Sequence, residues 1–138
     1  MSYSFIEVQI SESITEIILN RPERRNALSY RMIAELTSAF NEVGASEALA
    51  VILGANGPVF CAGHDFADML DQDLAGMRKL MQACSQLMQL IHAVPQPVIA
   101  QVQGPAIGAG CQLALSCDMT VASEAASFRT PGGGGGSL

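Results

Sequence analysis

Strand-like and helix-like hydrophobic patterns alternate along this chain of 138 residues, and that alternation limits the folds it can adopt. Segments 5–10 and 15–19 read as two strands of a hairpin, joined by a short Ser-Glu-Ser turn. Further strands are predicted over 49–53, 97–103 and 119–122, with helical patterns between them. The resulting order, β-β-α-β-α-β-α-β, predicts an α/β protein built from stacked repeats.

Helices are expected in the intervening segments. Apolar residues recur at helical spacing over 32–43, and Ser29 is placed to cap the N-terminus of that helix. A longer, methionine-rich pattern over 74–91 predicts a second helix whose methionines pack in the core, and Pro95 ends it by removing a backbone donor. A short helix of small residues is expected over 110–115.

Composition indicates a large core and argues against two classes of partner. Hydrophobic residues make up 49% of the chain and charged residues 14%, which is too apolar for intrinsic disorder. The net charge of -6 disfavours contact with a phosphate backbone, so nucleic acid is not an expected partner. Residues 80–117 contain no Asp, Glu, Lys or Arg, but glutamines, prolines and glycines interrupt them, and no membrane span is expected.

The cysteines and the N-terminus both bear on location. The 4 cysteines form neither a CxxC pair nor a Cys/His cluster, which predicts reduced thiols and no metal site. Residues 1–10 resemble neither an export signal nor a presequence for import into an organelle. A cytoplasmic location is therefore predicted.

Two glycine-bearing loops, each between a predicted strand and a predicted helix, are the candidate functional elements. Gly63 marks the first loop, while Gly104, Gly108 and Gly110 mark the second. Glycine permits positive φ and the close approach of another molecule. Backbone N–H groups left unpaired where the following helices begin can hold an oxyanion.

Short motifs around these loops occur together in a recognisable order. They are Asn20-Arg21-Pro22, Arg25-Asn26-Ala27-Leu28, Phe60-Cys61-Ala62-Gly63-His64-Asp65, Pro97-Val98-Ile99-Ala100, Val102-Gln103-Gly104, Gly108-Ala109-Gly110-Cys111 and Ser116-Cys117-Asp118. In this combination the chain resembles the N-terminal portion of the crotonase superfamily, the enoyl-CoA hydratases and isomerases. The resemblance extends over nearly the whole chain up to Pro131.

The resemblance implies a crotonase-like spiral of ββα units, truncated before the C-terminal spiral turns and the trimerisation helices. A partial crotonase-like domain is expected over 1–131, followed by a Gly-rich flexible tail over 132–138. The charge-free segment 80–117 is then expected to present apolar faces without a partner in this chain. Association with further copies or with a full-length relative is the corresponding expectation.

The resemblance also implies an acyl-CoA thioester as the substrate, with coenzyme A entering as part of that substrate and no separate cofactor. The backbone N–H groups of His64 and Ala109 are implied to hold the thioester or enolate oxygen. Arg24 and Arg25 either meet the CoA phosphates or remain solvated charges. The positions implied to contact the substrate are Arg24, Arg25, Ala27, Ala62, Gly63, Asp65, Gly108 and Gly110.

The resemblance further implies two acid/base glutamates, at positions that in this sequence hold Gln112 and Gly132. Neither residue can transfer a proton at neutral pH. Asp65 is favoured as a helix N-cap, and Cys61 and Cys111 as small core residues.

Three functions remain open at this point. One is a truncated crotonase-like chain with the ancestry of an acyl-CoA hydratase or isomerase, whose own catalysis is left open. The others are a noncatalytic acyl-CoA-binding subunit and a fragment without function.

Overall fold

A five-stranded sheet forms the centre of the computed structural model, which describes residues 2–130. Strands β1 (Ile6–Ser11) and β2 (Ile14–Leu19) form the predicted antiparallel hairpin at one edge. Strands β3 (Ala50–Ala55), β4 (Val98–Val102) and β6 (Met119–Ala122) follow in parallel, in the order β1-β2-β3-β4-β6. The mixed architecture confirms the predicted α/β class.

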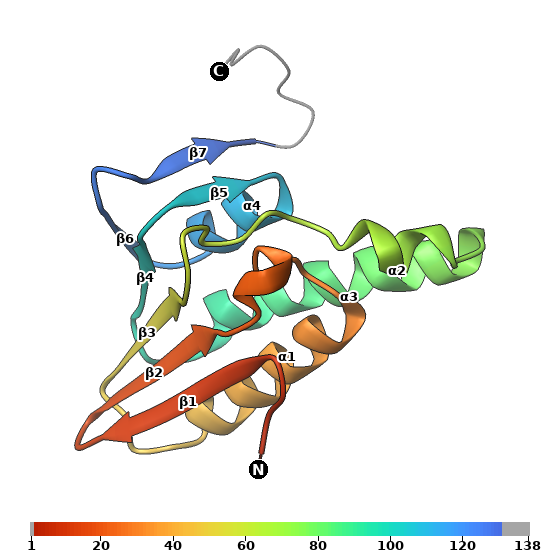
Figure 1. Cartoon of the computed structure of the whole chain (residues 1–138). Helices are drawn as coiled ribbons and strands as arrows, with labels where there is room; N and C mark the ends of the chain where they lie inside the picture. Colours follow the sequence, from red (N-terminus) through yellow and green to blue (C-terminus); the bar gives the residue numbers. More distant parts are fainter. Residues whose placement is uncertain (1, 131–138) are drawn as a thin grey trace.

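Helices cover one face of this sheet because alternate strand residues present apolar side chains to it. Ile17, Leu53 and Ala100 are paired across β2, β3 and β4, and all of them are fully buried. Helices α1 (Tyr30–Gly44) and α3 (Leu74–Ala93) lie side by side against that face (Figure 1). The parallel strands are thus joined by helical crossovers, as parallel pairing requires.

A side-chain cap marks the start of α1, and a proline determines the end of α3. The Ser29 hydroxyl accepts the Met32 N–H at 3.0 Å, which confirms the predicted N-cap of α1. Helix α3 ends at Ala93, and its C-cap Val94 has an extended backbone, as expected for the residue before Pro95.

Several short elements were not predicted. Strands β5 (Pro105–Ile107) and β7 (Ser127–Arg129) pair in parallel as a second, two-stranded sheet. They lie beside α4 (Ala109–Leu115), the short helix predicted over 110–115. A 3-10 turn, η1 (Pro22–Arg24), and helix α2 (Phe66–Leu70) fill two loops. These pieces are too short to show a hydrophobic period, so only their partners define them.

The expected core role of the methionines on α3 is wrong for Met81, which is 41% exposed. The buried face of α3 consists of Leu80, Cys84, Leu87 and Ile91, and Met81 lies one position off that face. Met77 and Met88 are only partly buried.

The expectation that the charge-free segment 80–117 presents apolar faces without a partner is also wrong for most of the segment. Among its large hydrophobic side chains, only Met81 and Leu115 are exposed, because the segment supplies much of the core. The other exposed large hydrophobic side chains lie outside it, and those on α2 and at the start of α3 project away from the body (Figure 1). These side chains belong to Ile10, Tyr30, Leu49, Phe66, Leu70, Leu74, Met119, Val121 and Phe128.

Residues 2–130 contain no helix that is both long and apolar enough to cross a bilayer. Within the same residues no cluster of three or more His, Cys, Asp or Glu side chains is arranged to hold a metal ion. The predicted tail over 132–138, and the boundary at Pro131, lie outside the described residues.

Candidate functional site

The two predicted glycine loops lie against each other. Cys61 and Ala106 form a parallel bridge, so the first loop runs alongside β5 and into the second loop. The Phe60 N–H donates to the Pro105 carbonyl at 3.0 Å, and the Ile107 N–H donates to the Cys61 carbonyl at 3.0 Å. Residues more than 40 positions apart in the chain are therefore brought into one site.

Glycine is required at two contact points between these loops. Gly63 has φ +95°, and a Cβ there would lie 3.0 Å from the Ile107 carbonyl oxygen and 3.6 Å from the Ala109 nitrogen. A Cβ at Gly110 would collide with the carbonyl oxygen of Cys61. Any larger residue would push the loops apart.

Two backbone N–H groups are left without partners where the loops meet. The Leu28 N–H donates to the Gly63 carbonyl at 2.6 Å and the Asp65 N–H donates to the Leu28 carbonyl at 3.2 Å, so the N–H of His64 points away from Leu28. Ala109 is the first residue of α4, where no intrahelical acceptor is available. Neither N–H has a hydrogen-bond partner in the described part of the chain.

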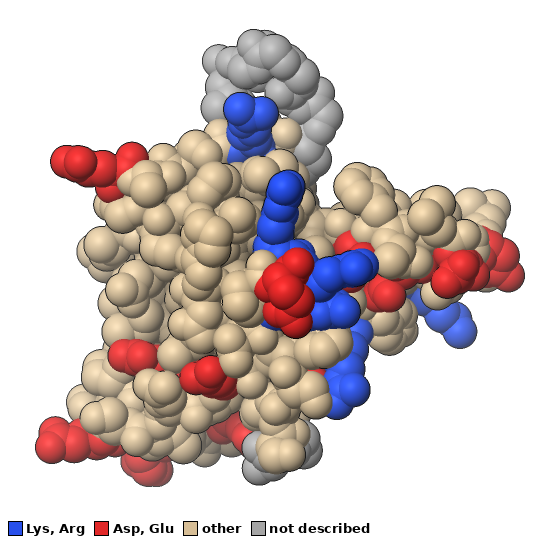
Figure 2. Space-filling model, viewed as in Figure 1, with Lys and Arg blue, Asp and Glu red and all other residues tan. Residues whose placement is uncertain are grey.

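The loop between β2 and α1 carries Arg21, Arg24 and Arg25, and this arginine loop packs on the first glycine loop. The Ala62 N–H donates to the Arg25 carbonyl at 3.1 Å, and Arg25 adopts a left-handed conformation with φ 53°. Arg24 and Arg25 are exposed, whereas Ala27 is buried beneath them. Figure 2 shows basic side chains gathered along a central strip of this face, with one acidic group among them, while most other acidic side chains lie toward the margins of the face or on the arm formed by α2 and the start of α3.

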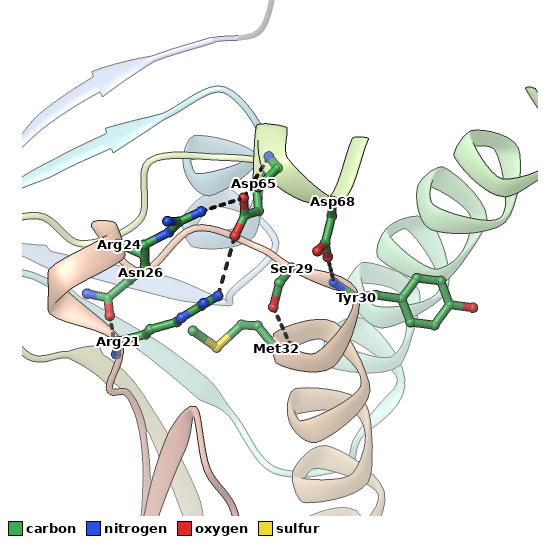
Figure 3. A network of polar contacts seen from close by, with 9 residues as sticks. Arg21, Arg24, Asn26, Ser29, Tyr30, Met32, Asp65 and Asp68 are labelled. Atoms are coloured by element: carbon green, nitrogen blue, oxygen red, sulfur yellow. Dashed lines mark hydrogen bonds and ion pairs between the residues drawn. The ribbon is translucent and has the colours of Figure 1, made fainter. Parts of the chain in front are cut away.

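Asp65 is engaged inside the protein. Its carboxylate caps α2 by accepting the Ala67 N–H at 2.9 Å, which confirms the N-cap interpretation. The same carboxylate lies 3.4 Å from the guanidinium groups of Arg21 and Arg24 (Figure 3). Only 5% of the side chain is exposed, so Asp65 positions the arginine loop and α2 relative to each other.

Sequence reasoning assigned no role to Asn26, which holds this loop in place. Asn26 is fully buried: its Oδ1 accepts the Arg21 N–H, and its Nδ2 donates to the carbonyls of Asn56 and Val59, each at 2.9 Å. The Asp68 carboxylate accepts the Tyr30 N–H at 2.6 Å (Figure 3). The only signal for Asn26 in the sequence was its place within the motif Arg25-Asn26-Ala27-Leu28.

The remaining ionisable groups near the loops differ in reactivity. Burial raises the pKa of the Cys61 thiol to about 12 and also raises the pKa of Cys111, so both are core residues. Burial lowers the pKa of the half-buried His64 imidazole. Gln112 is exposed on α4, and Gly132 lies outside the described residues.

Comparison with known proteins places this geometry in a family. The family model for enoyl-CoA hydratase/isomerase matches residues 9–137. The chain belongs to the enoyl-CoA hydratase/isomerase family. The resemblance to the N-terminal portion of this family is therefore confirmed.

Relatives within the enoyl-CoA hydratase/isomerase family agree in sequence and in fold. The chain is 45% identical to the mitochondrial enoyl-CoA hydratase domain-containing protein 3 of Danio rerio, over 86% of this chain and 42% of that protein. It is 41% identical to a probable enoyl-CoA hydratase of Rhodobacter capsulatus, over 93% of this chain and 49% of that protein. The crystal structure of human enoyl-CoA hydratase domain-containing protein 3 matches with a TM-score of 0.90 and 39% identity, over 94% of this chain and 52% of that chain.

The chain spans about half the length of the relatives that it matches. The fold is therefore the crotonase fold over about half of its usual extent.

Proposed function

We propose that this protein binds an acyl-CoA thioester and holds its carbonyl or enolate oxygen between the N–H groups of His64 and Ala109. The observation that carries the proposal is the pair of partner-free N–H groups on two loops in direct contact. Fixed donors of this kind, aimed at a developing negative charge in a dry site, can be worth several kcal/mol each. Membership of the enoyl-CoA hydratase/isomerase family supports the same substrate class.

The arginine loop supplies the natural place for the phosphates of coenzyme A. Arg24 and Arg25 are exposed next to the first glycine loop, on a chain whose net charge is -6. Side chains with guanidinium groups suit phosphate oxygens. Coenzyme A arrives as part of the substrate in this proposal, and no separate cofactor is invoked.

Proton transfer is the part of the family chemistry that the proposal leaves out. The amide of Gln112 cannot act as a general acid or base at neutral pH. The carboxylates of Asp65 and Asp68 are already bound to arginines and to backbone N–H groups. These observations favour a second candidate function, that of a noncatalytic acyl-CoA-binding subunit, over an enoyl-CoA hydratase or isomerase.

Calorimetric titration with acetyl-CoA tests the proposal, with free coenzyme A as the comparison. Saturable binding of acetyl-CoA, stronger than that of coenzyme A, is expected. Ala109→Pro removes one N–H at the first helical position, where proline is tolerated, and should abolish the difference between the two ligands. Ala109→Gly keeps the N–H and should preserve the difference. An unchanged difference in Ala109→Pro would refute the oxyanion assignment.

Turnover of a crotonyl thioester distinguishes an enzyme from a binding subunit. A steady-state rate that disappears in Ala109→Pro would show an enzyme. Binding without turnover would favour the noncatalytic subunit, and folded protein without binding would leave the fragment hypothesis.

Self-association, or association with a full-length relative, is proposed as well. Met119 and Val121 are exposed on β6, which lies at an edge of the sheet. Exposed apolar side chains on an edge strand favour pairing with another chain. Sedimentation velocity over a range of concentrations tests this. A cytoplasmic location is also proposed, although some relatives are named as mitochondrial proteins.

A further inference from the structure

The short segment that carries the His64 N–H lies between the body of the protein and a projecting helix. On the body side it is held by backbone bonds: the Leu28 N–H donates to the Gly63 carbonyl at 2.6 Å, and the Asp65 N–H donates to the Leu28 carbonyl at 3.2 Å. Beyond Asp65 the chain enters α2, which has no buried residue and projects from the body (Figure 1). The side chain of Asp65, only 5% exposed, therefore supplies the anchor on this side.

Helix α2 itself adds little to this anchor. Its bond from the Tyr30 N–H to the Asp68 carboxylate is exposed to solvent, and Met69 is only partly buried. An exposed hydrogen bond contributes less to order than a shielded one, because water competes for both partners. The orientation of the segment around His64 thus depends on what holds Asp65.

The carboxylate of Asp65 lies between two arginines of unequal freedom (Figure 3). Arg21 Nη1 is 3.4 Å from Oδ2, and Arg24 Nη2 is 3.4 Å from Oδ1. The Arg24 side chain is 47% exposed and is open to a ligand, whereas the Arg21 side chain is 22% exposed. Arg21 is therefore the more enclosed of the two partners.

Arg21 is fixed at both its backbone and its guanidinium group. Its N–H donates to Oδ1 of the fully buried Asn26 at 2.8 Å, and its carbonyl accepts the Asn26 N–H at 3.0 Å. Its guanidinium carbon lies 4.2 Å from the centroid of the Phe5 ring, a cation–π contact. Phe5 is held in turn, because its N–H donates to the Glu35 carboxylate on α1 at 2.8 Å. A continuous series of contacts thus runs from α1 through Phe5 and Arg21 to Asp65, the residue after His64.

We propose that Arg21 is a positioning residue for the oxyanion site. Arg21 holds Asp65, and through Asp65 it keeps the N–H of His64 aimed at the thioester oxygen, without itself contacting the ligand. The inference rests on the proposed function, which assigns that N–H to the thioester oxygen. Donors in such a site are effective because their direction is fixed before the ligand arrives. Loss of the Arg21 guanidinium should therefore weaken the hold on the acyl group and spare the hold on coenzyme A.

Affinities for acetyl-CoA and free coenzyme A separate these two parts of the ligand. Arg21→Gln should reduce the preference for acetyl-CoA over coenzyme A by about threefold to tenfold, the range for losing most or all of one hydrogen bond. Arg31→Gln is the matched control. Arg31 lies over the same Phe5 ring, at 5.3 Å, but it pairs with Glu35 and not with Asp65, so its loss should leave the preference unchanged.

The infrared spectrum of bound acetyl-CoA with an isotope-labelled thioester carbonyl reports on the donors directly. Hydrogen bonding weakens the carbonyl bond, so binding to the unmodified protein should lower its stretching frequency. In Arg21→Gln the frequency should move back toward that of free acetyl-CoA, and in Arg31→Gln it should not. Phe5→Leu removes the ring beneath Arg21 and no charge, so it should shift the frequency in the same direction by less, even if Arg21→Gln proves too unstable to study.

Three outcomes would count against these assignments. A preference and a carbonyl frequency that stay unchanged in Arg21→Gln, or in Phe5→Leu where Arg21→Gln does not fold, would overturn the inference. Equal losses in Arg21→Gln and Arg31→Gln would also overturn it, because they would show a general loosening of the fold. An unmodified protein without any preference for acetyl-CoA would refute the proposed function itself, and the inference with it.

Discussion

Replacing Asp65 by asparagine separates the two roles of this carboxylate, which are to cap helix α2 and to form ion pairs with two arginines. Asparagine caps a helix about as well as aspartate, so Asp65→Asn should keep the bond from the Ala67 N–H and lose the ion pairs with Arg21 and Arg24. Asp65 is 5% exposed, while the two guanidinium groups are 22% and 47% exposed. Their solvation weakens both pairs well below the cost of breaking a fully buried pair.

The magnitude follows from that exposure. We expect about 1 kcal/mol for the better shielded Arg21 pair and about 0.5 kcal/mol for the Arg24 pair, both within the range of partly exposed ion pairs. Asp65→Asn should therefore lower the free energy of unfolding by about 1.5 kcal/mol at low salt. The loss should shrink as salt is added, because screening already weakens these pairs in the unmodified protein.

Urea denaturation of Asp65→Asn beside Asp73→Asn provides the assay. Asp73 caps α3 through the Gly76 N–H at 2.8 Å, and it forms no ion pair with any residue that the structure describes. Asp73→Asn should change the free energy of unfolding by less than about 0.5 kcal/mol. Equal losses in the two variants, or a loss in Asp65→Asn that does not depend on salt, would refute the assigned ion pairs.

Three further predictions concern the rest of the molecule. Burial acts to raise the pKa of Glu35, but hydrogen bonds from Phe5, Arg31 and Ser4 outweigh it, so the pKa falls below its ordinary value of 4.5. The folded state then binds this proton less tightly than the unfolded state, and Glu35 stabilises the fold above about pH 4.5 and loses that effect as pH falls through the folded pKa. In urea titrations between pH 7 and pH 3, Glu35→Gln should flatten this decline, and an unchanged slope would count against it. Gly110→Ala should lower the free energy of unfolding by about 2 kcal/mol, because the new Cβ collides with the Cys61 carbonyl oxygen. Gly54→Ala is the control: the nearest atom is 3.9 Å from its new Cβ, so the free energy of unfolding should change by less than about 0.5 kcal/mol. Similar urea midpoints for the two variants would contradict this prediction. In native protein at pH 8 the buried cysteines should resist alkylation by iodoacetamide, and in urea they should react, which mass spectrometry can measure. Rapid labelling of Cys61 in native protein would contradict the site geometry, because burial raises the pKa of its thiol to about 12.

Long periodic segments were readable from the sequence because their own side chains define them. The apolar spacing after Ser29 predicted α1 with its cap, and two apolar strand segments on either side of a Ser-Glu-Ser turn predicted the hairpin. Met81 shows the limit of such reasoning, since hydrophobicity alone does not say which side of α3 faces the sheet. The prediction of unpartnered apolar faces on the segment 80–117 was wrong for most of that segment. A charge-free run of residues has the same sequence pattern whether it packs in the core of its own chain or against another chain.

What the sequence alone determined about this protein is its α/β class, its family and the two glycine loops that carry the candidate site. These follow from period, motif order and the need for glycine at particular backbone angles. The tertiary structure decided the pairing of β5 with β7, the burial of Asp65 between two arginines, and the meeting of the two partner-free N–H groups of His64 and Ala109. Each of these features depends on contacts between residues far apart in the chain, and the pattern of a short segment does not show which distant residues it will contact.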